Sequence, residues 1–278
     1  MINTTKFHLV VLLLSAGLLI NSTTSWTQQK DDEQKNLSSK WGPDDQKGAT
    51  NRITPAKVIE AAKLISEGKI FELGQTYETS MPLGGRNFTL HLITPPPIGP
   101  SNKNKLVGNL DFFTGEIGQV GTQLDALGHV GYRGEEADFY YNGFTGTEVY
   151  SSSGLRKLGV EYAGPFFTRG VLIDVAGYKK IERLEVGYEI TVDDLQGALK
   201  KQNVVINKGD VVLIRTGHSK LWKVDNEAYY DWDLGEPGIG VKAAKWLANQ
   251  KVVIVGSDNY GVEVIPFAKA STAYPVHL

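Results

Sequence analysis

The side chains best suited to chemistry gather in one short polar segment of this sequence. The chain has five histidines, and four of them lie beyond the apolar N-terminal stretch: His91, His129, His218 and His277. Because an isolated histidine is more often structural than catalytic, a candidate needs reactive neighbours. His129 has such neighbours, since Gln119, Gln123 and Asp125 precede it closely along the chain.

The spacing of these four residues suits a shared pocket wall. On an extended backbone, alternate side chains point to one face, and Gln119, Gln123, Asp125 and His129 all occupy odd positions. Their amide, carboxylate and imidazole groups are all capable of binding a metal ion. The alternative that the spacing leaves open is a polar strand edge that runs into a turn.

Other common catalytic motifs are missing from the sequence. There is no P-loop, H-E-x-x-H or G-x-S-x-G motif, and the glycines at 115, 118 and 121 do not match G-x-G-x-x-G. The chain has no cysteine, which excludes disulfides, zinc ribbons and a thiol nucleophile. The polar segment is therefore the main candidate for a functional site.

The polar segment resembles the signature of the cyclase-like metal-dependent hydrolase family, which includes bacterial kynurenine formamidases and isatin hydrolases. The usual signature is H-x-G-T-H-x-D-x-x-x-H, and residues 119–129 read Q-V-G-T-Q-L-D-A-L-G-H. Further similar segments follow the family's order: residues 41–45 (WGPDD), 211–217 (VVLIRTG), 237–239 (PGI), 256–259 (GSDN) and 275–277 (PVH). Together they span nearly all of the chain beyond its N-terminal stretch, so the chain is identified as a member of this family.

The resemblance implies a metal site and a catalytic histidine. The family's metal ligands correspond here to Gln119, Gln123, Asp125 and His277, and its general base, which then acts as the acid, corresponds to His129. The expected cofactor is one or more divalent ions, Mn²⁺ or Zn²⁺, with Mg²⁺ also suitable. Because glutamine offers a harder donor than the imidazole of the usual motif, the replacements favour Mn²⁺ or Mg²⁺ over Zn²⁺.

Two departures from the family pattern bear on function. Both motif histidines are glutamines, and the chain ends at Leu278, before the E-N-L segment whose glutamate completes the family's metal site. We therefore expect the C-terminal part of the domain to be missing. Retention of Asp125, His129 and His277 favours an enzyme, whereas the departures favour a non-catalytic small-molecule binding protein that keeps the fold without metal.

The function that the resemblance implies is hydrolysis of a C–N amide bond in an N-formyl arylamine or a cyclic amide. Such an enzyme is arylformamidase-like, as in the conversion of tryptophan to kynurenine. The substrate is then a small aromatic amide. A proline-rich loop over residues 81–100 and the side chains of Phe139, Tyr140 and Tyr141 could line its pocket or serve ordinary packing, so no substrate-binding residue is assigned.

The remaining polar candidates have weaker support. His91 lies in an apolar context that favours a structural role, and His218 follows an expected strand without a role that the family implies. Asp258 and Asn259 also follow a strand, where they either support the metal site or form a turn.

The elements that must position these residues alternate between helices and strands. Thr54 and Pro55 predict a helix start, with the helix continuing to Gly68, and residues 70–79 predict a strand. Residues 81–109 are expected to form a loop. Residues 170–176, 210–216 and 252–256 are Val- and Ile-rich runs typical of buried strands, with helices expected to begin at Thr191 and Gly240. This order predicts a single α/β domain; the resemblance implies a mixed β-sheet with swivelling β/β/α topology.

The ends and the charge of the chain indicate an exported protein. Residues 1–25 resemble a signal peptide, with Lys6, an apolar run and a small polar exit, and an uncleaved anchor is the alternative. Residues 26–48 are expected to be a polar linker and 49–278 the cyclase-like hydrolase domain. We expect a periplasmic or secreted protein without stable membrane association after cleavage. A net charge of −2 argues against nucleic-acid binding, and the resemblance implies a homo-oligomer.

Overall fold

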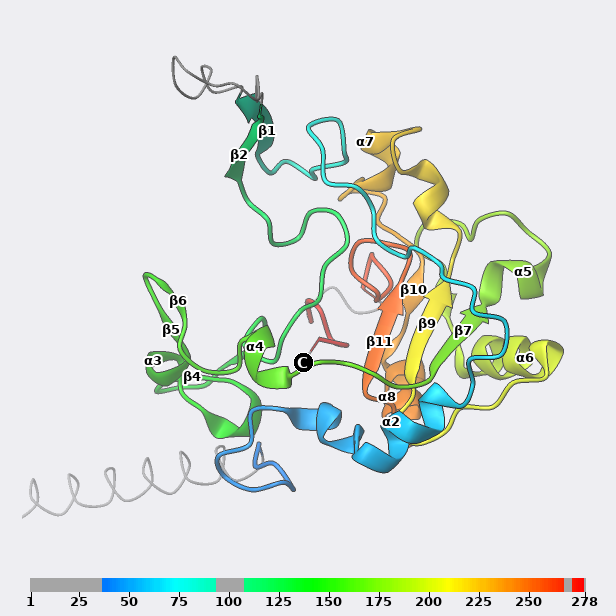
Figure 1. Ribbon diagram of the computed structural model, residues 1–278, viewed down its shortest axis with the longest axis horizontal. Helices are drawn as coiled ribbons and strands as arrows, with labels where there is room; N and C mark the ends of the chain where they lie inside the picture. Colours follow the sequence, from blue (N-terminus) through cyan, green and yellow to red (C-terminus); the bar gives the residue numbers. More distant parts are fainter. Residues whose placement is uncertain (1–36, 94–107, 268–271, 278) are drawn as a thin grey trace, which may run out of the picture. The chain divides into compact units, whose positions relative to one another are not determined.

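The computed structural model describes residues 37–93, 108–267 and 272–277 of the chain (Figure 1). The predicted signal peptide and the first part of the predicted linker lie outside these residues. The chain divides into two compact units: Met1–Gly48 with Asp125–Gly164, called the first unit, and Ala49–Leu124 with Pro165–Leu278, called the second unit. No helix among the described residues is long and apolar enough to cross a bilayer.

A three-stranded parallel sheet forms the centre of the second unit. Its strands are β7 (Gly170–Asp174), β9 (Val211–Arg215) and β11 (Ile254–Ser257), with β9 in the middle. Val171 pairs with Val212 and Ile173 with Ile214, and all four side chains are at most 2% exposed. The three predicted strands are thus confirmed, and their β-branched side chains suit the buried face of the sheet. Residues between them are more exposed, with Leu172 at 52%.

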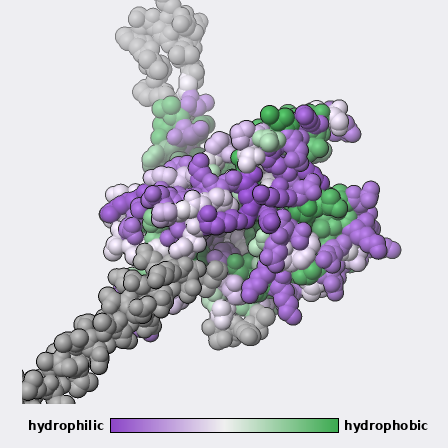
Figure 2. Space-filling view, turned by 90° about the horizontal axis from the view of Figure 1, so that it is seen from below, coloured by the Kyte–Doolittle hydropathy of each residue, from purple (hydrophilic) through white to green (hydrophobic). Residues whose placement is uncertain are grey.

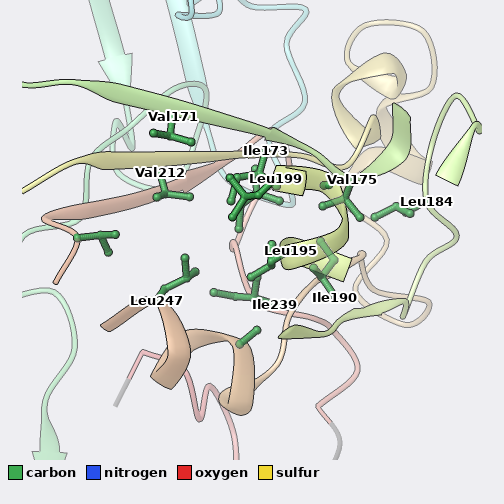
Figure 3. Close-up of a cluster of buried hydrophobic side chains, with 14 residues drawn as sticks. Val171, Ile173, Val175, Leu184, Ile190, Leu195, Leu199, Val212, Ile239 and Leu247 are labelled. Atoms are coloured by element: carbon green, nitrogen blue, oxygen red, sulfur yellow. The ribbon is translucent and has the colours of Figure 1, made fainter. Parts of the chain in front are cut away.

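Helices α6 (Val192–Gln202) and α8 (Val241–Asn249) begin where the sequence predicts them. Thr191 caps α6 by accepting a hydrogen bond from the Asp194 amide, and the Asp194 carboxylate accepts one from the Thr191 amide in return. The apolar faces of α6 and α8 pack with the sheet in one core (Figure 3). Its leucines, isoleucines and valines are Val171, Ile173, Val175, Leu184, Ile190, Leu195, Leu199, Val212, Ile214, Ile239, Leu247 and Val252.

Helix α2 (Pro55–Ala62) starts at the predicted cap but ends earlier than predicted. The Thr54 side chain accepts a hydrogen bond from the Lys57 amide at 3.3 Å. The predicted end at Gly68 is wrong, because the residues beyond Ala62 have no buried surface to pack on and Ile65 is 68% exposed. A helix of this length depends on tertiary contacts, which α2 makes through Lys57 and Ala61.

A buried ion cluster anchors α2 to the rest of the second unit. The Asp210 carboxylate is fully buried and lies 2.8 Å from both the Lys57 ammonium and the Arg169 guanidinium. Burial alone lowers the pKa of Lys57, but its hydrogen bonds to Asp210 and Glu60 outweigh that effect and raise the pKa. The lysine therefore stays charged inside the fold.

Residues 70–93 and 108–115 differ from the sequence prediction. Residues 70–79 form no strand, whereas the predicted loop contains β1 (Phe88–Ile93), which pairs antiparallel with β2 (Leu110–Gly115). Proline and glycine next to β1 concealed its alternating apolar residues. Leu92 is 66% exposed and Phe112 52%, and apolar side chains are visible at the surface among polar ones (Figure 2).

The first unit is built from short elements around a small core of Phe144, Val149 and Leu158. Its elements are β3 (Tyr132–Arg133), β4 (Asp138–Phe139), η2 (Tyr141–Gly143), α3 (Gly146–Val149), β5 (Tyr150–Ser151), β6 (Gly154–Leu155) and α4 (Val160–Ala163). The described end of the predicted linker packs in this unit, where the Ser39 amide donates to Asn142 Oδ1 at 2.7 Å.

The second unit also contains several short elements: η1 (Gly48–Arg52, whose first residue belongs to the first unit), α5 (Val175–Lys179), β8 (Glu189–Ile190), η3 (His218–Leu221), α7 (Asn226–Tyr229) and β10 (Gly238–Ile239). Strand β10 pairs parallel with β8. The predicted mixed α/β class is confirmed, with parallel and antiparallel pairs in separate small sheets.

We expect Asp210→Ala to lower the free energy of unfolding by about 3–5 kcal/mol, because two buried cations lose their shared carboxylate. Urea denaturation followed by circular dichroism measures this change. Glu67→Ala is the control, since the Glu67 and Lys69 side chains form an ion pair while 66% and 69% exposed. That variant should change stability by no more than about 0.5 kcal/mol. Similar losses in both variants would contradict the assigned role of the buried cluster.

Candidate active site

The segment that carries the two motif glutamines is a turn rather than an extended strand. Gln119 has φ of 63° and Gly121 has φ of 62°, both in the left-handed region. The prediction that alternate residues face one side is therefore wrong, because left-handed residues reverse the chain locally. The turn instead brings the two glutamines together directly, with the Gln119 amide donating to the Gln123 side-chain oxygen.

Two tyrosines hold this turn. The Tyr77 hydroxyl lies 2.7 Å from the Val120 carbonyl and 2.8 Å from the Thr122 carbonyl, and the Tyr230 hydroxyl donates to the Gln119 carbonyl at 2.9 Å. A Cβ atom on Gly121 would lie 2.2 Å from the Tyr77 ring, so only glycine fits there. Burial raises the pKa of Tyr77 and raises that of Tyr230 to about 12, so both hydroxyls remain donors at neutral pH.

Asp125 and His129 are four residues apart in a loop of the first unit, and their side chains lie close together. His129 Nε2 lies 3.8 Å from an Asp125 carboxylate oxygen, and the two side chains are 38% and 36% exposed. The His129 amide donates to the Ala126 carbonyl at 2.9 Å, and the Gly128 amide donates to Leu158 at 3.0 Å. An imidazole and a carboxylate held this way, with access to water, can exchange protons with a substrate.

His277 lies in the second unit beside a glutamate that the sequence reasoning missed. Its Nδ1 contacts Glu263 Oε1, and Glu263 Oε2 accepts a hydrogen bond from the Val276 amide at 3.2 Å. The Glu263 side chain is 1% exposed. A single glutamate inside an apolar run gives no sequence signal of this contact, because its partner lies in a separate segment.

The types of donor that the motif supplies fit a hard or borderline divalent cation. Gln119 and Gln123 offer amide oxygens, Asp125 a carboxylate and His277 an imidazole nitrogen. Within the described part of the chain, no group of three or more His, Cys, Asp or Glu side chains is placed to hold a metal ion. Two of the four predicted ligands are glutamines, which are not among those four residue types.

The two other histidines have structural surroundings. His218 is fully buried, and its Nε2 lies 2.9 Å from the Tyr229 carbonyl. Burial lowers its pKa, so the ring is neutral and donates to that carbonyl. His91 is exposed on β1 and stacks on Phe112 with 6.3 Å between ring centroids.

Asp258 and Asn259 shape the loop that follows β11. Asp258 accepts hydrogen bonds from the Thr216 amide at 2.6 Å and from the Gly217 amide at 2.9 Å. Asn259 donates to the Pro237 carbonyl at 2.6 Å and accepts from the Val262 amide at 3.0 Å. Both residues therefore form the turn after β11, and the same loop carries Glu263.

The aromatic residues proposed for a substrate pocket include two that serve packing. Phe139 is 1% exposed, and the Tyr141 hydroxyl donates to Asp45 at 2.6 Å within the first unit. Tyr140 meets Tyr150 edge to face at 6.1 Å. Of the proline-rich loop, Met81 is 2% exposed in a core cluster, and residues 94–100 lie outside the described residues.

A second fully buried glutamate, Glu236, lies just before β10 and contacts the loop that follows β11. Glu236 Oε2 accepts a hydrogen bond from the Tyr260 amide at 2.7 Å, and its Oε1 has no hydrogen-bond partner among the described residues. Burial raises the pKa of Glu236 well above its ordinary value, reinforced by the charges of Glu263 and Asp258. The carboxyl group is therefore protonated over a wide pH range.

A parallel sheet packed against helices defines an α/β protein, and this protein carries a solvent-accessible imidazole–carboxylate pair. Residues 71–264 match the family described as "Putative cyclase", and the chain belongs to this family. A crystal structure of a novel cyclase is similar at 34% identity, covering 84% of this chain and 79% of that one, with a TM-score of 0.74.

Two isatin hydrolases share the fold. Isatin hydrolase A from Ralstonia solanacearum is 23% identical over 81% of this chain and 80% of its own, with a TM-score of 0.54. An isatin hydrolase bound to the product analogue thioisatinate is 20% identical, with the same coverage and a TM-score of 0.51. No curated protein matches the chain.

We expect Glu236→Gln to remove part of the pH dependence of stability. The folded state keeps a proton on Glu236 that the unfolded chain releases above its ordinary pKa of 4.5, so the wild type loses stability as pH rises from there toward the raised pKa. The variant lacks this loss, which reaches about 1.4 kcal/mol per pH unit. Its stability relative to the wild type should therefore increase as the pH rises above about 5.

Urea denaturation at several pH values measures this difference. Glu67→Gln, at an exposed position, should give a curve parallel to that of the wild type. A parallel curve for Glu236→Gln as well would show that Glu236 is ionised in the folded protein.

Proposed function

We propose that this protein is a metal-dependent hydrolase that cleaves the C–N bond of a cyclic amide or an N-formyl arylamine. The observation that carries the proposal is the solvent-accessible His129 imidazole, 3.8 Å from the Asp125 carboxylate, at the end of the family's motif. Membership of the cyclase family and the likeness in fold to isatin hydrolases support this class of reaction.

The proposed substrate is a small planar aromatic amide. Opening a lactam ring such as that of isatin and removing the formyl group of an N-formyl arylamine both hydrolyse a carbon–nitrogen bond. An arylformamidase-like role, with N-formylkynurenine of tryptophan catabolism as the substrate, is the finer form of the proposal. We also propose that the domain has the swivelling β/β/α topology that the family resemblance implies.

We assign the metal-binding role to Gln119, Gln123, Asp125 and His277. A divalent ion held there would make water more acidic and polarise the amide carbonyl. His129 Nε2 removes a proton from the attacking water and then returns it to the leaving nitrogen. The Asp125 carboxylate lies 3.8 Å from the same nitrogen, so the metal-ligand candidate and the proton-transfer candidate are neighbours.

We expect His129→Ala to lower kcat about 10²–10⁴-fold on isatin or N-formylkynurenine, because proton transfer to and from Nε2 is lost. The measurement is hydrolysis followed by absorbance, with the protein loaded with Mn²⁺. His91→Ala is the matched control, since His91 is exposed on β1, and it should keep kcat within about twofold. A His129→Ala variant that hydrolyses as fast as the wild type would show that His129 is not the base.

We expect the double variant Gln119→His, Gln123→His to bind Zn²⁺ at least about tenfold more tightly relative to Mn²⁺ than the wild type does. Imidazole is the softer ligand and suits Zn²⁺, whereas amide oxygens suit Mn²⁺. Titration calorimetry with each ion measures this ratio, and Gln250→His, at the end of α8, is the control. If neither the wild type nor the double variant binds either ion, the metal-free binding protein becomes the better description.

A further inference from the structure

We propose that Glu263 is a positioning residue that holds the His277 imidazole by Nδ1 and so reserves Nε2 as the metal-binding nitrogen. This inference rests on the proposed function, because it assigns a role toward the same ion. It concerns a residue outside the motif segment, in the loop that follows β11.

Both carboxylate oxygens of Glu263 contact the segment that carries His277. Oε1 contacts His277 Nδ1, and Oε2 accepts the hydrogen bond of the Val276 amide at 3.2 Å. Two contacts to consecutive residues fix the backbone as well as the ring. The His277 amide also donates to the Tyr274 carbonyl at 3.1 Å, and the rings of Tyr274 and His277 meet edge to face at 5.4 Å.

The contact with Glu263 selects one tautomer of the His277 imidazole. A neutral imidazole has one N–H donor and one acceptor nitrogen, and a carboxylate accepts hydrogen bonds. The contact with Glu263 therefore places the proton on Nδ1 and leaves the lone pair on Nε2. Carboxylates that bind the second nitrogen of a metal-binding histidine fix its tautomer and orientation and increase its basicity.

Glu263 is itself held rigidly. Its side chain is 1% exposed, and its neighbour Val262 has φ of 67°, which is strained for a β-branched residue. Such strain persists only where surrounding bonds enforce it and often accompanies a functional site. Asn259 enforces it here by accepting from the Val262 amide at 3.0 Å and donating to the Pro237 carbonyl at 2.6 Å.

A close backbone contact adds to this rigidity. A Cβ atom on Gly238 would lie 2.3 Å from the Glu263 carbonyl carbon, so the β10 backbone approaches Glu263 in a way that only glycine permits. Glu263 also forms a parallel bridge with Ile239. The backbone of Glu263 is therefore fixed against β10, and His277 is the group that its carboxylate orients.

The test compares Glu263→Gln with Glu236→Gln. Both substitutions replace the carboxyl group of a glutamate that is at most 1% exposed with an amide of nearly the same size. Glu263 lies in the loop after β11 and Glu236 accepts a hydrogen bond from it, but only Glu263 contacts His277. Titration calorimetry with MnCl₂ on the full chain should show affinity about 10–100-fold weaker for Glu263→Gln. Glu236→Gln should bind Mn²⁺ within about threefold of the wild type. Equal affinity in Glu263→Gln and the wild type would overturn the proposal.

A second readout needs no metal. In metal-free protein labelled with ¹⁵N-histidine, His277 should be the Nδ1–H tautomer in the wild type and should lose that preference in Glu263→Ala, with His277→Gln used to assign its signals. An unchanged tautomer in Glu263→Ala would overturn the positioning role. A wild type that binds no Mn²⁺ would refute the proposed metal site, while a tautomer that depends on Glu263 would still support the orientation of the ring.

Discussion

The Asp258 carboxylate connects the ends of two parallel strands, and the candidate site in the second unit depends on that connection. Asp258 follows β11 and accepts hydrogen bonds from the Thr216 amide and hydroxyl, both at 2.6 Å, just beyond β9. Hydrogen bonds to a charged acceptor are stronger than neutral ones, commonly about 1.5–3 kcal/mol each. The loop that starts at Asp258 therefore leaves the sheet in one fixed direction and places Glu263 beside His277. His277 is thus positioned from the ends of β9 and β11 through a series of short polar contacts.

Buried charge in the second unit is handled in three different ways, and the differences separate structure from chemistry. Asp210 lies between the Lys57 ammonium and the Arg169 guanidinium, and these ion pairs hold α2 in place. Glu236 has a pKa raised by burial and is protonated, so it needs no cation. Glu263 has an imidazole and an amide as its partners. A buried carboxylate whose partner is itself a candidate metal ligand is the one of the three that can influence a reaction.

The sequence predicts the centre of the fold well because the decisive forces there are local. Three Val- and Ile-rich runs become β7, β9 and β11, and Thr191 caps α6 as expected, since burial and capping are encoded within a few residues. The motif turn could not be predicted from spacing, because the left-handed Gln119 depends on hydroxyls of distant residues such as Tyr230. The loop composition of residues 81–109 likewise concealed β1, whose pairing with β2 is long-range. The family resemblance supplied the candidate residues, and the structure supplied Glu263.

The two glutamines change how the strength of the candidate metal site is distributed. An amide oxygen is a neutral donor, so replacing two imidazoles with amides leaves Asp125 and His277 as the strong ligands of the proposed set. The orientation of His277 then matters more than it would in a site with three imidazoles, because fewer ligands can compensate for a misplaced ring. A carboxylate bonded to Nδ1 also makes Nε2 a better electron donor. In the proposed metal site, Glu263 would therefore offset part of the loss in ligand strength that the glutamines cause. This compensation favours the proposed enzyme over a metal-free binding protein.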